Sequence, residues 1–132
     1  MPPGKGRKAL SNKTQERKVR FVVLDGFKRT YQEFKDKSPE ISGRVTEFNR
    51  VKRIIPPIPL DQKFQDHVLT GPLAGIRECH LAHDVLLLYT HADDLVTMFI
   101  ICNHDDLHFP AFYSAMRKKL VATRQKRAKL KR

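Results

Sequence analysis

The stretch that decides the fold is IRECHLAHDVLLLYTHADDLVTMFIIC, residues 76–102. Its runs of β-branched, aromatic and other apolar residues predict three strands, over residues 76–82, 85–90 and 95–102. The turns between them are so short that only antiparallel neighbours are possible, so the three strands form a meander. The second and third runs are continuously apolar, which is typical of central strands covered by helices on at least one face.

Before the meander, the pattern changes from strand to helix. The run RFVVLDGF (residues 20–27) predicts a first strand. Phe27, Tyr31 and Phe34 then fall on one face of a short helix. Ser38-Pro39 predicts the N-cap and first position of a second helix. This helix must end before Pro56-Pro57, and its expected apolar stripe is Ile41, Val45, Phe48, Val51 and Ile55.

The remaining segments complete the element order. Residues 56–75 are rich in proline and glycine and are expected to form a connector. Pro110 opens a last helix, in which apolar residues recur at helical spacing up to Leu120. The order β, α, α, β, β, β, α predicts an α+β fold, with an N-terminal strand and a two-helix hairpin packed on a small antiparallel sheet.

Positive charge is concentrated at the two ends of the chain. The formal net charge is +12 over 132 residues; residues 1–20 hold seven Lys or Arg and one Glu, and residues 111–132 hold nine and no acid. We therefore divide the chain into a flexible basic arm (1–19), a globular domain (20–109) and a C-terminal basic helix (110–132). Basic arms favour RNA, DNA, ribosomes or an acidic protein as partners, although they can also serve only as solubilising tails. The expected RNA contacts in the last segment are Arg117, Lys118, Lys119, Arg124, Lys126 and Arg127.

Other features of the composition indicate in which cellular compartment the protein is expected. The two cysteines, Cys79 and Cys102, form no CxxC motif, so a reducing environment is expected. The N-terminus has positive charge but no apolar stretch behind it, unlike a secretory signal. No apolar run approaches the ~18 residues that would suggest a membrane span. These features predict a cytoplasmic protein without a membrane partner.

Histidine is the residue type that suggests chemistry. All six histidines lie in the second half of the chain, mostly near carboxylates. Two or three imidazoles around one phosphate could cleave RNA without a metal: one removes the 2′-OH proton and another group protonates the leaving 5′ oxygen. A cation such as Arg77 would stabilise the phosphoryl charge, although strand alternation puts Arg77 and His80 on opposite faces.

A metal site is the competing chemistry. Cys79, His80, Cys102 and His104 could gather around zinc if their strands are neighbours. No pair has an established zinc-knuckle spacing, however, and both cysteines fit the core as small apolar residues. We therefore expect neither a metal nor another cofactor.

The run DHVLTGPLAGIRECHLAHDVLLLY (residues 66–89) resembles the YafQ-like branch of the RelE/ParE toxins. That branch has Asp-His-x-Leu-x-Gly, then Gly-x-Arg-x-x-His, an Asp, an apolar strand ending in Tyr, and a later histidine motif. The segment ICNHDDL (residues 101–107) takes the place of this last motif. The residues at matching spacings are Asp66, His67, Leu69, Gly71, Gly75, Arg77, His80, Asp84 and Tyr89.

The resemblance covers residues 20–109 and implies a fold, an activity and partners. It implies a RelE-like domain that cleaves mRNA on the ribosome, and a small antitoxin that covers its site. The implied catalytic residues are His67, His80, Asp84 and His104. His104 is the expected general acid, His67 or His80 the base, and Asp84 would orient a histidine or contact RNA. Arg77 and His108 are expected to contact RNA.

Some residues depart from the family pattern. Val85 replaces an aromatic residue that would offer a stacking surface for a base. His108 stands at the final Phe position, and Asn103 replaces a small residue. Two functions therefore stay open: a ribonuclease, or a catalytically weak or inactive binder of ribosomal RNA that modulates translation through its arms. DNA binding is a third possibility, but it lacks a helix-turn-helix or ribbon signature.

Overall fold

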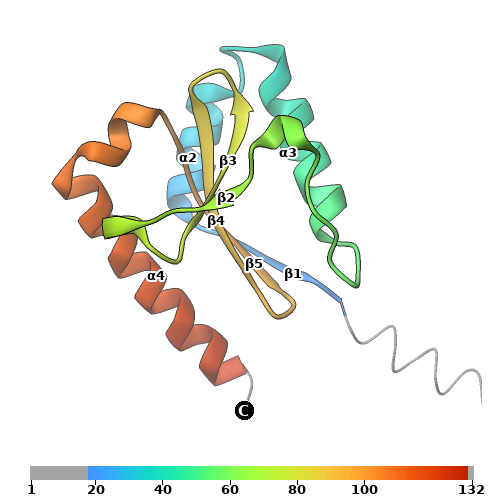
Figure 1. Cartoon of the computed structure of the whole chain (residues 1–132), viewed down its shortest axis with the longest axis vertical. Helices are drawn as coiled ribbons and strands as arrows, with labels where there is room; N and C mark the ends of the chain where they lie inside the picture. The colour runs from blue at the N-terminus through green and yellow to red at the C-terminus, as the bar shows by residue number, and fades with distance from the viewer. Residues whose placement is uncertain (1–17, 131–132) are drawn as a thin grey trace, which may run out of the picture.

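The computed structural model describes residues 18–130, with side chains up to Lys126. The predicted N-terminal arm therefore lies outside the described residues except for its last two positions. The chain forms a five-stranded sheet with α-helices on both faces (Figure 1). The elements in chain order are β1 (Arg20–Val23), α2 (Asp25–Phe34), α3 (Pro39–Lys52), η1 (Gln62–Phe64), β2 (His67–Val68), η2 (Gly71–Leu73), β3 (Arg77–Ala82), β4 (Val85–Ala92), β5 (Leu95–Cys102), η3 (His104–His108) and α4 (Pro110–Leu130).

The predicted meander is confirmed. Strands β3, β4 and β5 pair antiparallel in sequence order. Asp84 and Asp93 occupy the two turns, each with φ of 55°, a left-handed conformation that Asp tolerates better than most residues. Short turns of this kind match the twist of the flanking strands and so set the pairing register.

The N-terminal strand makes the sheet mixed rather than purely antiparallel. β1 lies at one edge and pairs parallel to β5, so the strand order is β1-β5-β4-β3-β2. The strand is also shorter than the predicted run of residues 20–27. The backbone N–H of Leu24 donates to the Met98 carbonyl at 3.0 Å, and α2 begins one residue later at Asp25. Phe27 therefore reaches the core from a helix and not from a strand.

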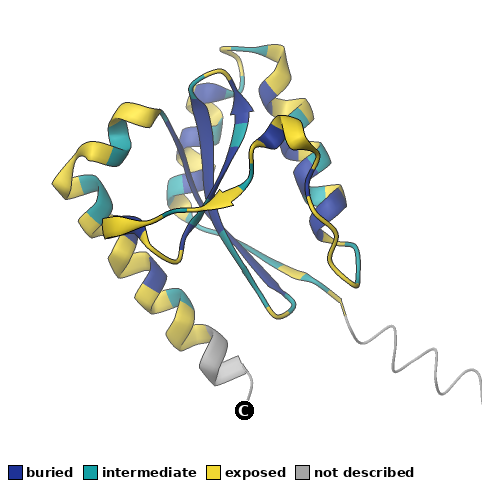
Figure 2. Ribbon diagram, viewed as in Figure 1, coloured by how far each residue is buried: buried dark blue, intermediate teal, exposed yellow. Residues whose placement is uncertain are grey.

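Each face of the sheet carries its own apolar core. On one face, Phe27, Phe34, Ile41 and Phe48 from α2 and α3 pack against residues of the meander. On the other face, Met116 and Leu120 of α4 pack against a second set that includes Leu86, Leu88 and Ile100. Burial is therefore continuous along β5 and along β4 as far as Tyr89 (Figure 2), which explains why both runs are apolar without alternation.

The predicted start of α3 at Ser38-Pro39 and its predicted end before Pro56-Pro57 are both confirmed, but its apolar stripe is shorter than expected. Ser38 is the N-cap, its hydroxyl accepts from the Glu40 backbone N–H at 3.3 Å, and Pro39 takes the first position. The helix ends at Lys52, so including Ile55 in the helical stripe was wrong. The prolines that follow remove backbone donors and forbid a further turn.

The connector between α3 and β3 contains more structure than the sequence predicted. It includes two short 3-10 turns and the two-residue strand β2, which pairs antiparallel with β3. A strand of two residues is too short to show any periodicity. Among the described helices, none combines the length and the apolar character needed to cross a bilayer.

A buried threonine links α2 to β5 beyond the point where β1 has ended. Thr30 is 6% exposed; its hydroxyl donates to the Gly26 carbonyl at 2.7 Å and accepts from the Ile101 backbone N–H at 2.9 Å. The side chain therefore satisfies a backbone donor of β5 that has no further strand beside it. Buried N–H groups need such a partner.

We predict that Thr30→Val lowers the free energy of unfolding by roughly 1–3 kcal/mol, because it leaves the buried Ile101 N–H without an acceptor. Thr30→Ser keeps the hydroxyl and should cost less. Urea denaturation followed by circular dichroism measures both. Equal losses for the two variants would show that the hydrogen bond to Ile101 contributes little.

Candidate active site

The feature that organises one end of the sheet is the buried carboxylate of Glu78 on β3. Its side chain is only 5% exposed, and three imidazole rings surround it. His80 Nε2 lies 3.4 Å from Oε1, His104 Nε2 lies 3.8 Å from Oε1, and His67 Nε2 lies 3.8 Å from Oε2. A buried carboxylate is costly without positive charge or donors nearby, so these four residues form one electrostatic unit.

Strand pairing brings the three rings to the carboxylate. His67 in β2 is the direct antiparallel partner of Glu78, so the two side chains share a face of the sheet. His80 follows Glu78 by two residues along β3 and points to that same face. His104 opens η3, just beyond the end of β5. Three of the predicted catalytic residues therefore meet at one place.

Asp84, the fourth predicted residue, fixes the orientation of His104. Its Oδ1 accepts the His104 backbone N–H at 2.9 Å and the ring Nδ1–H at 2.6 Å. These hydrogen bonds, the backbone one foremost, hold the pKa of Asp84 below its ordinary value. Since a carboxylate can only accept, Nδ1 carries the ring proton and Nε2 is left facing Glu78.

His80 is the most enclosed of the three rings. Its side chain is 17% exposed, against 53% for His67 and 48% for His104. Burial lowers the pKa of His80, and the negative charge of Glu78 opposes this effect. The ring meets that of His104 edge to face, with centroids 5.4 Å apart. A neutral imidazole can accept a proton and a ring held by a carboxylate can donate one, so this pair of rings suits general acid–base catalysis.

Two cations border the same site. A cavity of about 490 Å³ opens beside His80 and His104, and Arg44 and Lys63 line it. Arg44 Nη1 donates to the His80 carbonyl at 3.0 Å, which ties α3 to β3. Lys63 Nζ lies 2.8 Å from a carboxylate oxygen of Glu47. Positive charge at this rim suits a phosphate that approaches the imidazoles.

Sequence reasoning missed Glu78 and Arg44 as parts of the site. Glu78 had a recognisable signal, because it is a charged residue within a mostly apolar strand and stands two positions before His80. Arg44 had none, because it is one of several basic residues along the polar side of α3.

Arg77 is not brought to the histidines. Because side chains alternate between the two faces along β3, Arg77 lies on the other face of the sheet from His80. Its register partner on the neighbouring strand β4 is Tyr89. Its guanidinium donates to Asp66 at 3.3 and 3.2 Å, and the Tyr89 hydroxyl donates to the same carboxylate at 2.5 Å. Arg77, Asp66 and Tyr89 therefore form a separate polar cluster.

The other predicted RNA contacts are spread along the surface. Arg117, Lys118, Lys119, Arg124 and Lys126 are exposed on α4, which runs from the histidine end of the sheet toward the opposite end (Figure 1). Arg117 Nη1 donates to the Pro72 carbonyl at 3.0 Å. His108 is exposed at the end of η3. The side chain of Arg127 lies outside the described residues.

The zinc set considered from the sequence is wrong. Cys79 belongs to the core on the face opposite His80, and Cys102 is buried as well. Burial raises the pKa of both thiols, which keeps them protonated. A different set could hold a metal ion: ligand atoms of Glu78, His80 and His104 all lie within 4.8 Å of one another. Imidazole and carboxylate ligands suit zinc or copper.

The fold, a helix pair on a small sheet, is shared with a YoeB/ParE toxin from Agrobacterium tumefaciens, which has a TM-score of 0.52 and 12% identity over 65% of this chain and 99% of that one. Residues 19–109 match the family described as "Bacterial toxin of type II toxin-antitoxin system, YafQ". This match spans more than half of the chain. The chain therefore belongs to the YafQ family of toxins from type II toxin–antitoxin systems. The match ends at Phe109, directly before α4.

Known relatives agree with this assignment. A YafQ toxin of Haemophilus influenzae is 24% identical over 78 residues, which are 59% of this chain and 76% of the relative. YafQ in the Escherichia coli DinJ–YafQ toxin–antitoxin complex has the same fold, with a TM-score of 0.57 and 19% identity over 69% of this chain and 98% of that one. A copper-bound mutant toxin from Helicobacter pylori has a TM-score of 0.53 and 27% identity over 67% and 98%.

We predict that His80 titrates below the ordinary value of about 6.5, because burial disfavours its charged form. Glu78→Gln should lower its pKa further, because the carboxylate is the main opposing influence. A depressed folded-state pKa means that His80 destabilises the fold as pH falls below about 6.5. NMR titration of the ring protons tests this, with the denatured protein as the reference. A folded-state midpoint at or above that of the denatured protein would contradict the prediction.

Proposed function

We propose that this toxin is a ribosome-dependent endoribonuclease that cleaves mRNA by histidine acid–base catalysis in the cytoplasm. The observation that carries the proposal is the convergence of His67, His80 and His104 on the buried Glu78, with Asp84 holding His104. Family membership supports a toxin, and the arrangement of rings supports this chemistry for it.

The geometry suggests a role for each ring in the cleavage step. His80, kept neutral by burial, takes the proton of the RNA 2′-OH. The 2′ oxygen then attacks the adjacent phosphorus, and the bond from phosphorus to the 5′ oxygen breaks. His104 acts in its imidazolium form, with a proton on each ring nitrogen: it gives the Nε2 proton to the leaving 5′ oxygen, while Asp84 keeps the ring oriented through Nδ1–H. The products are a 2′,3′-cyclic phosphate and a 5′-hydroxyl.

Positively charged side chains around the site would stabilise the extra negative charge that develops on the phosphoryl group. Arg44 and Lys63 border the cavity and take the role that sequence reasoning gave to Arg77. His67 is the third ring, and its Nδ1 is held by the Gln65 carbonyl at 2.8 Å. Glu78 acts as a positioning residue: the Nε2 atoms of the three rings all approach its carboxylate, which is too buried to contact a substrate.

The proposed partners are mRNA, ribosomal RNA and a small antitoxin protein. The exposed basic residues of α4 would contact ribosomal RNA by neutralising its phosphates. The structure of the E. coli toxin in complex with its antitoxin supports an antitoxin partner for this chain.

We expect His104→Gln to reduce mRNA cleavage by about 10²- to 10⁴-fold, the usual contribution of a general acid or base. Ribosome binding should survive, because His104 is not part of the basic surface. His91→Gln serves as the matched control, since His91 lies at the other end of β4, and it should cleave normally. Primer extension on ribosomes translating a defined mRNA measures cleavage, and co-sedimentation measures binding.

The rival function is a ribosome binder without catalysis. It predicts that His104→Gln is harmless while removal of residues 1–19 or 117–132 abolishes the inhibition of translation. The absence of new 5′ ends from the unaltered protein, with intact co-sedimentation, would reject the nuclease and favour the binder.

A divalent metal should inhibit this nuclease, because Glu78, His80 and His104 would coordinate it with the atoms that move protons. The copper-bound H. pylori toxin makes copper the first ion to test. We expect micromolar Cu²⁺ to slow cleavage and to broaden the NMR signals of His80 and His104, but not those of His91. A chelator selective for copper and zinc over magnesium should restore activity. Loss of cleavage on adding that chelator to untreated protein would contradict the metal-free mechanism.

A further inference from the structure

The strand that carries His67 has little support of its own. β2 has two residues, both of them exposed, and it lies at the edge of the sheet with β3 as its neighbour. Beyond the strand, the Leu69 backbone N–H donates to the Ile76 carbonyl at 2.8 Å. Two exposed residues in a short ladder bury little apolar surface, so a further interaction must keep His67 beside Glu78.

Asp66, directly before β2, provides this interaction. Its side chain is 15% exposed, and its carboxylate accepts hydrogen bonds from two strands. Arg77 on β3 donates through Nε at 3.3 Å and through Nη2 at 3.2 Å, one bond to each oxygen. The Tyr89 hydroxyl on β4 donates at 2.5 Å. Two-point contacts between arginine and a carboxylate fix geometry as well as adding energy. The start of β2 is therefore joined across β3 to β4.

The donor on β4 is fixed because it belongs to the core. Tyr89 is fully buried, and its ring meets that of Phe48 edge to face, with centroids 4.8 Å apart. The Lys52 ammonium lies 5.1 Å from the centre of the same ring. Burial, and then the hydrogen bond to Asp66, raise the pKa of the Tyr89 hydroxyl, so it stays protonated and able to donate. Asp66 is therefore bound to a side chain that the core holds in place.

The pairing register turns this hold on Asp66 into an orientation of His67. His67 lies opposite Glu78, and the next residue, Val68, lies opposite Arg77. Since successive side chains alternate between the two faces of a sheet, the Asp66 carboxylate lies on the face opposite His67. A slip of one residue would turn His67 to the wrong face and separate Asp66 from Arg77. The ion pair therefore favours the register that the histidine site needs.

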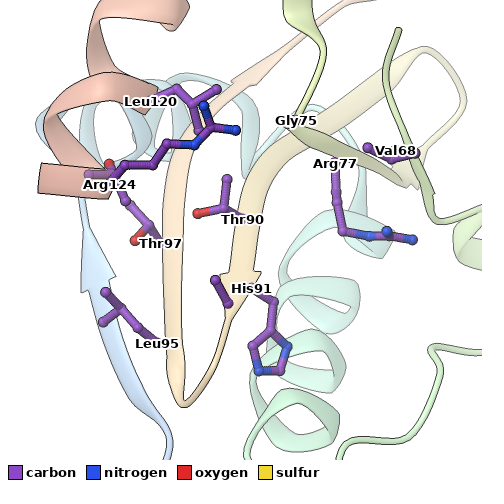
Figure 3. Close-up of a pocket in the computed structure, with 11 residues that line it drawn as sticks. Val68, Gly75, Arg77, Thr90, His91, Leu95, Thr97, Leu120 and Arg124 are labelled. Carbon is purple, nitrogen blue, oxygen red and sulfur yellow. The ribbon is translucent and has the colours of Figure 1, made fainter. Parts of the chain in front are cut away.

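Arg77 makes this contact although it also borders an open space. A cavity of about 270 Å³ lies beneath α4, between Arg124 on the helix and Thr97 on β5, and Arg77 is among the residues that line it. Figure 3 shows the Arg77 side chain extending away from Arg124. Its guanidinium reaches the Asp66 carboxylate instead. The positive charge of Arg77 is thus used beside β2 and not beneath α4.

We propose that Asp66, Arg77 and Tyr89 are positioning residues of the ribonuclease, which keep β2 in the register that directs His67 to Glu78. They act on cleavage through His67 and do not contact RNA. Arg77, which the sequence predicted to contact RNA, takes this role instead. The effect on cleavage rests on the proposed function, whereas the effect on His67 does not.

The position of His67 is measured first, in the full chain and without RNA. Asp66→Ala removes the acceptor, and Tyr89→Phe removes only the buried donor. We expect both substitutions to shift the NMR signals of the His67 ring more than those of the His104 ring. Both should also speed amide exchange at Leu69 roughly 10-fold, because they remove hydrogen bonds to a charged group that hold β2.

Two control variants separate positioning from a general loss of stability. Asp36→Ala makes the same substitution at an exposed carboxylate between α2 and α3, and should change neither Leu69 exchange nor cleavage. Thr30→Val lowers the free energy of unfolding at a site between α2 and β5, away from β2. At a temperature where its fold is intact, it should cleave within about twofold of the unaltered protein.

Cleavage on translating ribosomes then tests the link to catalysis. We expect Tyr89→Phe to lower kcat roughly 10- to 100-fold with KM changed less than about twofold, because a displacement of ~1 Å at a reacting group costs rates of this size. His67→Gln should cost at least as much. In the His67→Gln background, Tyr89→Phe should cost less than about twofold, because its effect passes through the imidazole.

The outcomes distinguish the positioning from the proposed function. An equal loss from Tyr89→Phe in both backgrounds would overturn the positioning role. Unchanged His67 ring signals and Leu69 exchange in both Asp66→Ala and Tyr89→Phe would overturn it as well. If the unaltered protein does not cleave, the proposed function fails, and the ring signals and exchange rates alone then support or overturn the positioning.

Discussion

Burial of the β4–β5 hairpin on both faces is the constraint on which the rest of the structure depends. Every residue of β5 is buried, with α2 on one side and α4 on the other. A polar group in the middle of such a sheet needs a partner inside the protein, which Thr30 provides for the Ile101 N–H. The polar side chains of the candidate site therefore lie at the ends of the strands and on β3, which is next to the two-residue edge strand β2.

Glu78 shows how a charge can persist near this core. Its carboxylate is enclosed by the rings of His67, His80 and His104, and the Nε2 atoms of all three rings point toward it. The environments of two rings then diverge: His80 is enclosed, and His104 is exposed and held by Asp84. Two groups of one residue type in different surroundings can serve as a base and an acid.

The C-terminal helix has two structural roles although it lies outside the region shared with the toxin family. Met116 and Leu120 complete the apolar core on the second face of the sheet. One turn further along, Arg124 covers the cavity above Thr97. The helix is therefore an integral layer of this protein, and its positive charges are carried on a rigid element packed against the sheet.

The sequence by itself determined the meander and the candidate residues, because strand period and turn length act over a few neighbouring residues. Asp84 and Asp93 lie in turns that leave no alternative pairing. The resemblance of the motif around residues 66–107 to the YafQ-like toxins selected His67, His80, Asp84 and His104 as candidates. Only the tertiary structure decided that β1 runs parallel to β5, that Glu78 lies between the rings, and that Arg77 turns to Asp66. These outcomes depend on which distant segments pair and which face each strand presents, and local patterns do not encode either choice.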